Sequence, residues 1–406
     1  MIASSTPLRS STFRHLAAAY TINELGNWVG DVALAILVFD RTGSALATAG
    51  LFLALRFAPA AFAPLFTSRL EVFAAHRVLP AIHLVEALIF ASIAWLSMHF
   101  SLPAVLALAI VDGVLAISAK ALTRSSTVAL LRPQGALREG NAIINMGATA
   151  GGALGPAFAG ALVGALGPAS ALLVDAATFV AVAAILATAA GLHMDSDRAR
   201  GSLGRMHRGL REAWTTPGVR HLLVAQAVAL IFFAAVIPIE VVFVKRTLHG
   251  GDAGYGALLA AWGVGMVAGG AAYAAAARVQ LLLVLALSTA LIAVGYGGLA
   301  VAPNLAIACL FSAIGGVGNG AQWIGVVTAV QEGVSSASQS AVMALLESIN
   351  QVMPAIGFLL GGAVATLASP RAAYAVAAAG VTLVLVAAAS RTPSELVGTV
   401  STEPRP

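Results

Sequence analysis

The chain has 406 residues, of which 59% are hydrophobic and only 10% are charged. Soluble domains carry about 25% charged residues, so a soluble fold would have to expose a very large apolar area to water. The net charge is only +5 and the basic residues are scattered between apolar segments, which argues against nucleic-acid binding. The sequence therefore predicts an all-α protein that crosses a lipid bilayer many times.

The first apolar stretch contains Glu24, Asn27 and Asp31. The apolar core of a signal peptide would not hold two carboxylates, and no small-residue cleavage site follows a short core here. We therefore expect this stretch to be a membrane helix that is retained.

Twelve stretches reach the roughly 20 mostly apolar residues that a helix needs to cross the hydrocarbon layer. They are 13–39, 44–68, 78–98, 102–123, 138–165, 168–191, 219–246, 253–277, 279–301, 303–330, 338–366 and 370–391. Pairs such as Gly167-Pro168 and Ser369-Pro370 supply turn chemistry between them.

A polar interruption at 192–218 separates six spans from the next six. It predicts an N-terminal six-helix bundle at 1–192, a linker at 193–218, and a C-terminal six-helix bundle with a short tail at 219–406. The segment 203–214 would form either a short helix on the membrane surface or part of a solvated linker.

Most lysines and arginines fall in the linker, in the two terminal segments and in the loops on the same side. Because cytoplasmic loops are enriched in these residues, both termini and the linker are expected in the cytoplasm. The expected location is the inner or plasma membrane of the cell, crossed many times.

Spans 5 and 11 share an element at equal spacing. Asn145 stands ten residues before Gly155, and Glu347 stands ten residues before Gly357. The two spans are six apart, as a duplicated six-helix half predicts.

Six spans plus six, cytoplasmic termini and a basic central linker resemble the major facilitator superfamily over nearly the whole chain. In span 5, Gly151, Gly155, Pro156 and Gly160 resemble the antiporter motif of drug-exporting members, with alanine in place of one late glycine. The resemblance implies two pseudo-symmetric six-helix bundles that work by alternating access.

Two further features resemble the branch that contains macrolide-efflux and enterobactin-exporter proteins. These are Thr42-Gly43-Ser44 and Arg56 shortly before Pro59. The loop between spans 2 and 3 departs from the superfamily pattern: it keeps the arginines Arg69 and Arg77 but has no clear counterpart of the usual aspartate, for which Glu71 is the candidate replacement.

Several ionisable residues lie inside the predicted spans. Placing a charged side chain there costs at least ~2.5 kcal/mol, so each is expected to have a charged partner, contact with water or a functional role. At about 1.5 Å per residue, Asp31, Arg56 and Asp112 lie roughly 12–18 Å below the outer ends of their helices, near the bilayer centre. Glu24 and Lys120 lie deeper, at about 22–27 Å. The first half is thus expected to hold two layers of charge.

Glu24, Asn27 and Asp31 share one helical stripe. By resemblance, this stripe of span 1 faces the central cavity. Burial and a nearby cation act in opposite directions on a carboxyl, so Asp31 could exchange a proton as Arg56 or a cationic substrate moves. Alternatively, Asp31 and Arg56 form a fixed pair that holds the helices together. Lys120 either neutralises Glu24 or extends to the inner surface.

The span 5 glycines Gly151, Gly155 and Gly160 should let a neighbouring helix approach closely, and Pro156 permits a kink. Gln322 and Trp323 lie on a span that lines the cavity in the superfamily. Each is expected either to contact substrate or to pack against a neighbouring helix.

Two further acidic residues are expected to be structural. Asp175 is expected to pack against a neighbouring helix, and Glu347 to contact a loop rather than substrate.

The sequence contains no GxxxxGK[ST] phosphate loop, no HExxH and no CxxC pattern. Nor can a nucleophile be paired with a base across the spans. No enzyme activity, cofactor or metal site is expected.

The resemblance implies a secondary transporter. The leading hypothesis is proton-coupled export of a small amphipathic compound, such as a drug, a macrolide-like metabolite or a siderophore. Uptake of a metabolite, and a receptor or scaffold without transport, are the alternatives. The expected partners are substrate, protons and lipid, with the chain acting as a monomer.

Overall fold

The computed structural model describes residues 7–70, 73–189, 192, 211, 214–215, 217–276, 279–334 and 339–389. All regular secondary structure in these ranges is helical. Glu71 and most of the linker lie outside them, so the predictions about that loop and about a surface helix stay predictions.

Seven helical elements, separated by short turns or directly continuous, form the first six spans. They are α1 (Ser11–Thr42), α2 (Ala45–Phe52), η2 (Leu53–Phe57), α3 (Ala58–Leu70), α4 (Ala75–Leu96), α5 (Leu102–Leu131) and α6 (Leu137–Ala187). α2, η2 and α3 together make the second span, and η2 is a π-helical turn.

The later spans follow the same pattern. They are α8 (Pro217–Ala234), η4 (Ile237–Ile239), α9 (Glu240–Val242), η5 (Phe243–Thr247), α10 (Gly251–Ala275), α11 (Leu281–Val301), α12 (Leu305–Gly333), α13 (Gln339–Leu367) and α14 (Pro370–Ala389). The first four of these elements form one span.

Eleven helical segments of the described chain are long and apolar enough to cross a membrane. One of them lies in α6, which has 51 residues and breaks at Gly167, where φ is 80° and ψ is 163°. Glycine adopts this conformation without a Cβ clash. α6 therefore contains two spans, 137–166 and 168–187, so the twelve predicted spans are confirmed.

The turn between the first two spans depends on Gly43 and Ser44. Gly43 has a φ of 62° and its N–H donates to Phe39 O at 2.7 Å, which ends α1. The Ser44 hydroxyl accepts from Ala47 N at 3.2 Å and begins α2. The left-handed glycine and the serine cap reverse the chain within two residues.

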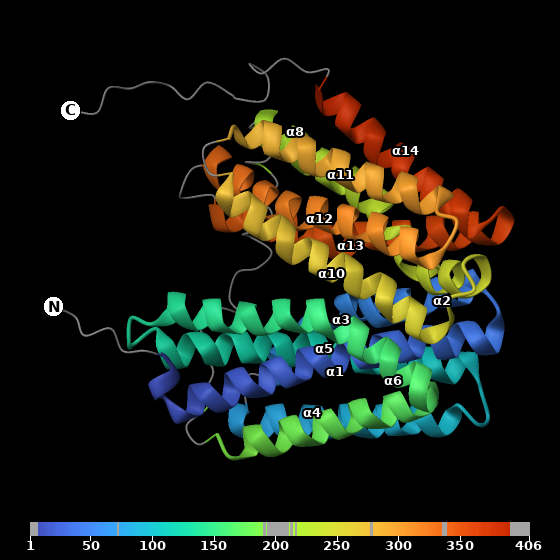
Figure 1. Cartoon of the computed structure of the whole chain (residues 1–406). Coiled ribbons are helices and arrows are strands. Elements are labelled where there is room, and N and C mark those ends of the chain that lie inside the picture. The colour runs from blue at the N-terminus through green and yellow to red at the C-terminus, as the bar shows by residue number, and fades with distance from the viewer. Residues whose placement is uncertain are drawn as a thin grey trace, which may run out of the picture. The chain divides into compact units, whose positions relative to one another are not determined.

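The helices form two compact units, which we describe separately. The first unit comprises residues 1–199 and 240–263, and the second comprises 200–239 and 264–406. In the first unit, α1 and α4 pack along α6, and α3 packs on α5 (Figure 1). In the second unit, α11 packs on α12 and α14, and α13 packs on α8 (Figure 1).

The glycine elements of spans 5 and 11 make equivalent contacts. A Cβ at Gly155 would lie 2.6 Å from Cβ of Trp28 on α1, the first span. A Cβ at Gly357 would meet the carbonyl of Ile231 on α8, the seventh span. The fifth span of each set of six therefore approaches the first span of the same set at a matched glycine.

Candidate functional site

Two ion pairs occupy the predicted charge layers of the first unit. Arg56 Nη2 lies 2.5 Å from Asp31 Oδ2, and Lys120 Nζ lies 3.3 Å from Glu24 Oε1. Each pair joins α1 to another helix. Neither is sealed from solvent, since the Arg56 side chain is 57% exposed and that of Lys120 is 46% exposed. Asn27 lies half-buried on α1 between the two carboxylates.

The π-helical turn η2 carries Arg56. This turn ends one residue before Ala58, and Pro59 follows. The facing residue on α5 is Gly113, where a Cβ would come within 2.5 Å of the Leu55 carbonyl oxygen. Single π turns inside α-helices occur frequently at functional sites. The close approach at Gly113 gives the turn room to hold Arg56 toward Asp31.

Asp112 does not join the Asp31–Arg56 pair. It is buried on α5, and no hydrogen-bond partner reaches its Oδ1 among the described residues. Of the three residues predicted in the central layer of charge, Asp31 and Arg56 thus form an ion pair, and Asp112 is a buried carboxyl outside that pair.

Two more buried acids lie behind the pairs, on α4 and in the second part of α6. His83 Nδ1 lies 2.6 Å from Glu86 Oε2, and the His83 ring stacks on Phe179 at 6.0 Å between centroids. Asp175 Oδ1 accepts from the Thr178 hydroxyl at 3.0 Å. The i, i+3 spacing of His83 and Glu86 on one helix was the sequence signal for their pairing.

Asp175 packs against α1, as expected. A Cβ at Gly26 or at Gly30 would clash with its carboxyl oxygens. Its hydrogen bond, however, goes to Thr178 on its own helix. The two glycines make room for a buried carboxyl between helices.

The antiporter-like motif lies along α6 and contacts two helices. Gly151 faces Glu24 of α1. A Cβ added at Gly151 would lie 3.1 Å from the Cβ of Glu24. Gly160 lies against Gly256 of α10, where a Cβ on either glycine would clash with the other backbone. The Pro156 carbonyl also faces Gly256. The motif thus permits close packing on both sides of the span.

Sequence reasoning missed a charged group where the C-terminal end of α1 meets η5 and the start of α10. Lys245 in η5 pairs with Asp40 of α1 and with Asp252 of α10, the latter at 2.6 Å. The neighbouring Arg246 donates to Gly43 O at 2.7 Å and lies 5.0 Å from the centre of the Phe39 ring. The sequence alone could not pair these two cations, because Asp40 and Gly43, which they contact, lie 205 and 203 residues earlier in the chain.

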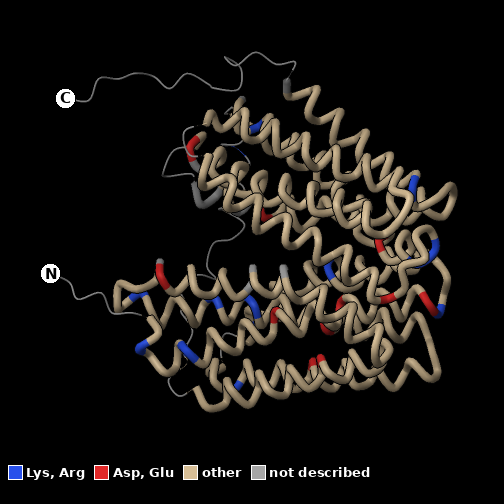
Figure 2. Tube along the Cα trace, viewed as in Figure 1, with Lys and Arg blue, Asp and Glu red and all other residues tan. Residues whose placement is uncertain are grey.

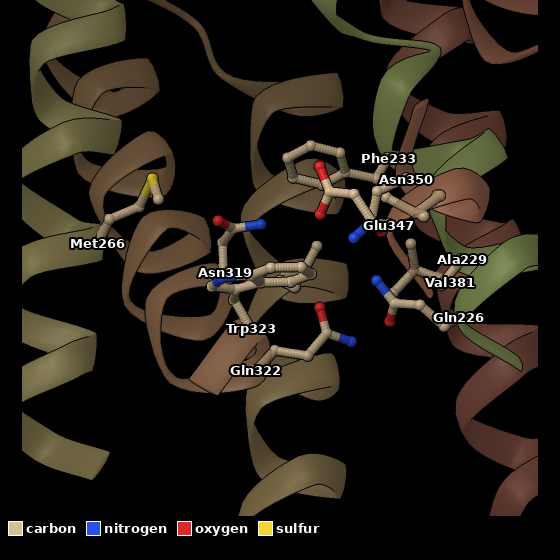
Figure 3. A pocket seen from close by; sticks show the side chains of 12 residues that line it. Gln226, Ala229, Phe233, Met266, Asn319, Gln322, Trp323, Glu347, Asn350 and Val381 are labelled. Carbon is tan, nitrogen blue, oxygen red and sulfur yellow. The ribbon is translucent and has the colours of Figure 1, made fainter. Parts of the chain in front are cut away.

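The second unit contains a cavity of about 370 Å³. Its polar lining residues are Gln226, Asn319, Gln322, Glu347 and Asn350, and its apolar ones are Ala229, Leu230, Phe233, Met266, Ile292, Trp323 and Val381. Figure 3 shows these side chains gathered around one space. Both predicted cavity residues, Gln322 and Trp323, line it. Glu347 also lines it, although the sequence analysis expected that residue to contact a loop.

Charge is distributed unevenly between the two units. Figure 2 shows acidic and basic residues along the helices of the first unit and few along those of the second. Among the described residues no group of His, Cys, Asp and Glu side chains could hold a metal ion. The first unit therefore holds paired charges, and the second unit, taken by itself, holds an amide-lined, aromatic cavity.

Comparison with known proteins identifies the fold and the family. Residues 2–399 match the profile of the MFS_3 family, described as transmembrane secretion effector. No curated protein matches the chain.

Solved structures share the fold at low identity. A mutant of the nucleoside transporter NupG has a TM-score of 0.74 at 13% identity, over 93% of this chain and 99% of that one. A bacterial homologue of the human lysosomal transporter Spinster has 0.67 at 17%, over 95% and 96%. A bacterial homologue of ferroportin has 0.68 at 13%, over 94% and 99%. The chain belongs to the transmembrane secretion effector family and is a multi-pass transporter of the major facilitator superfamily rather than an enzyme.

Proposed function

We propose that the protein exports small amphipathic compounds, such as drugs, macrolide-like metabolites or siderophores, in exchange for protons. It would work by alternating access as a monomer, in the inner or plasma membrane with both termini in the cytoplasm. The predicted six-helix halves, 1–192 and 219–406, would be its moving parts.

The observation that carries the proposal is the Asp31–Arg56 pair. Its members belong to different helices and lie 2.5 Å apart, while Asp31 is 21% exposed and Arg56 is 57% exposed. A pair that water can reach can open without leaving a bare charge in lipid. Once Arg56 moves away, Asp31 can accept a proton, and return of Arg56 favours its release.

Two further observations support export rather than uptake. The family to which the chain belongs is described as a secretion effector. Span 5 also carries the antiporter-like motif, whose Gly160 packs against Gly256 of α10. Neither feature depends on the identity of the substrate.

The test uses inverted membrane vesicles with an imposed pH gradient, acid inside, and the fluorescent dye ethidium. Wild-type protein should accumulate dye in proportion to the gradient. Asp31→Asn should abolish the effect of the gradient while dye exchange at equal pH continues. Glu139→Gln removes an exposed carboxylate at the start of α6 and serves as the control, which should behave as wild type.

The alternatives predict different results. A proton-driven uptake protein would move dye out of these vesicles when the inside is acid. A receptor or scaffold would show no flux in any variant. Flux that ignores the gradient in the wild type would remove proton coupling.

A further inference from the structure

We propose that the cavity of the second unit selects a small organic monocation with a flat ring, using Glu347 as the counter-ion and Trp323 as the stacking surface. The inference rests on the proposed function, because it names the substrate class of the same transporter. It narrows that class from amphipathic compounds in general to those that carry one positive charge.

Glu347 is the one ionisable residue among those that line the cavity. It lies on α13, two residues after the start of the membrane span at Leu345, and its side chain is exposed. Its carboxylate accepts from the neutral amide of Gln351 at 3.2 Å, and no lysine or arginine in the described ranges forms an ion pair with it. An exposed carboxylate that faces the cavity and has no paired cation gives the cavity a negative potential, which attracts a positively charged ligand. A positively charged ligand would supply the missing charge.

Trp323 presents an aromatic surface to the same space. Its side chain lies on α12 and stays 41% exposed, although the residue lies within the span Leu305–Val330. Figure 3 shows its ring in the middle of the group, with Phe233 and Glu347 above it and Gln322 below it. Tryptophan is the best aromatic partner for a cation, and an aromatic face also stacks on flat rings.

The neutral amide side chains around the cavity would orient a ligand, whereas Glu347 would select for its positive charge. Gln322 already donates to the Thr289 hydroxyl at 3.0 Å. Asn350 Oδ1 is buried and receives no hydrogen bond within the described part of the chain. An unsatisfied acceptor beside a carboxylate favours a ligand with N–H donors.

The size of the cavity limits the ligand. Ligand pockets commonly measure about 300–1,000 Å³, and this cavity of about 370 Å³ lies at the small end of that range. A few fused rings bearing an amine fit within it, whereas a macrocycle would have to extend beyond it.

The test measures binding by the purified full-length protein in lipid nanodiscs, without any gradient. Ethidium is the cationic probe, and the neutral analogue is 3,8-diamino-6-phenylphenanthridine, which keeps the rings and both amino groups but lacks the N-ethyl group and the positive charge. Wild type should bind the cation about tenfold or more tightly than the neutral compound, as expected for one charge-assisted contact. This comparison needs no variant, so it stands even if a substitution prevents folding. Equal affinity for the two compounds, or no binding of ethidium, would overturn the proposal.

Variants then identify the residues. Glu347→Gln should weaken ethidium binding about tenfold and leave the neutral analogue within about twofold, because only the charge is removed. Glu347→Asp should be intermediate. Trp323→Ala should weaken both compounds, and Trp323→Phe should recover part of the loss. Glu332→Gln, an exposed carboxylate on α12 outside the cavity, is the control and should match wild type.

The result separates this inference from the proposed function. A monodisperse Glu347→Gln variant that binds ethidium as tightly as wild type refutes the role of Glu347, even if proton-coupled flux persists. Conversely, flux that ignores the pH gradient refutes proton coupling and leaves the binding preference intact.

Discussion

Arg56 Nη2 and Asp31 Oδ2 lie 2.5 Å apart, so that the π-helical turn of the second span is joined to α1. The contact links the two residues that the sequence placed at the centre of the bilayer. The pair has two possible roles: it either only holds the two helices together or opens during transport. The first prediction distinguishes these roles.

Removing both charges should not restore transport. We compare Asp31→Asn, Arg56→Gln and the double variant in thermal unfolding and in gradient-driven dye flux. Together these variants form a double-mutant cycle. The interaction free energy between Asp31 and Arg56 that it gives should be about 1 kcal/mol or less, because both side chains are partly exposed. The double variant should still lack proton coupling, since no carboxyl remains at residue 31. Recovery of coupled flux in the double variant would show that the pair is only structural.

Close packing of α6 on α1 should be sensitive to a single methyl group at Gly155. A Cβ there would lie 2.6 Å from Cβ of Trp28, so Gly155→Ala should destabilise the protein by about 1–3 kcal/mol. The matched control is Gly152→Ala, where the nearest atom of Trp28 is 3.8 Å away. The unfolding midpoint in detergent reports the difference. Equal midpoints for the two variants would contradict this packing.

The buried His83–Glu86 pair should contribute to stability through its hydrogen bond. Glu86→Ala would leave the imidazole of a 3% exposed histidine without its partner, at a cost of about 1–3 kcal/mol. Glu86→Gln keeps an oxygen that can accept a hydrogen bond and should lose less. Thermal unfolding of both variants tests the order, and a more stable alanine variant would disprove it.

Lys245 should hold the outer end of α1 to the segment that follows α8. Lys245→Met would leave Asp40 and Asp252 without the cation they share, whereas Lys245→Arg would keep it. We expect the methionine variant to lose about 1 kcal/mol at low salt and less at high salt, because the three side chains are partly exposed and salt screens such pairs. Unfolding at two ionic strengths measures this. A loss that is independent of salt would point to packing instead.

The membrane class and the spans could be predicted from the sequence because both depend on local properties. Runs of about 20 apolar residues mark the spans, and the Gly167-Pro168 break is visible as turn chemistry. The depth of Asp31 and Arg56 also followed from counting residues along helices of known rise. Hence the sequence by itself placed Asp31 and Arg56 at similar predicted depths on neighbouring spans, because depth depends only on position along each helix.

Only the tertiary structure decided which side chains meet. Lys245 finds Asp40 at a separation of 205 residues, and Glu347 lines a cavity rather than contacting a loop. Such contacts depend on how helices rotate and pack against one another, and neither is encoded in the periodicity of one helix. The structure also showed that Asp112, predicted at the same depth as Asp31 and Arg56, is buried outside their ion pair, because a shared depth does not imply a shared face.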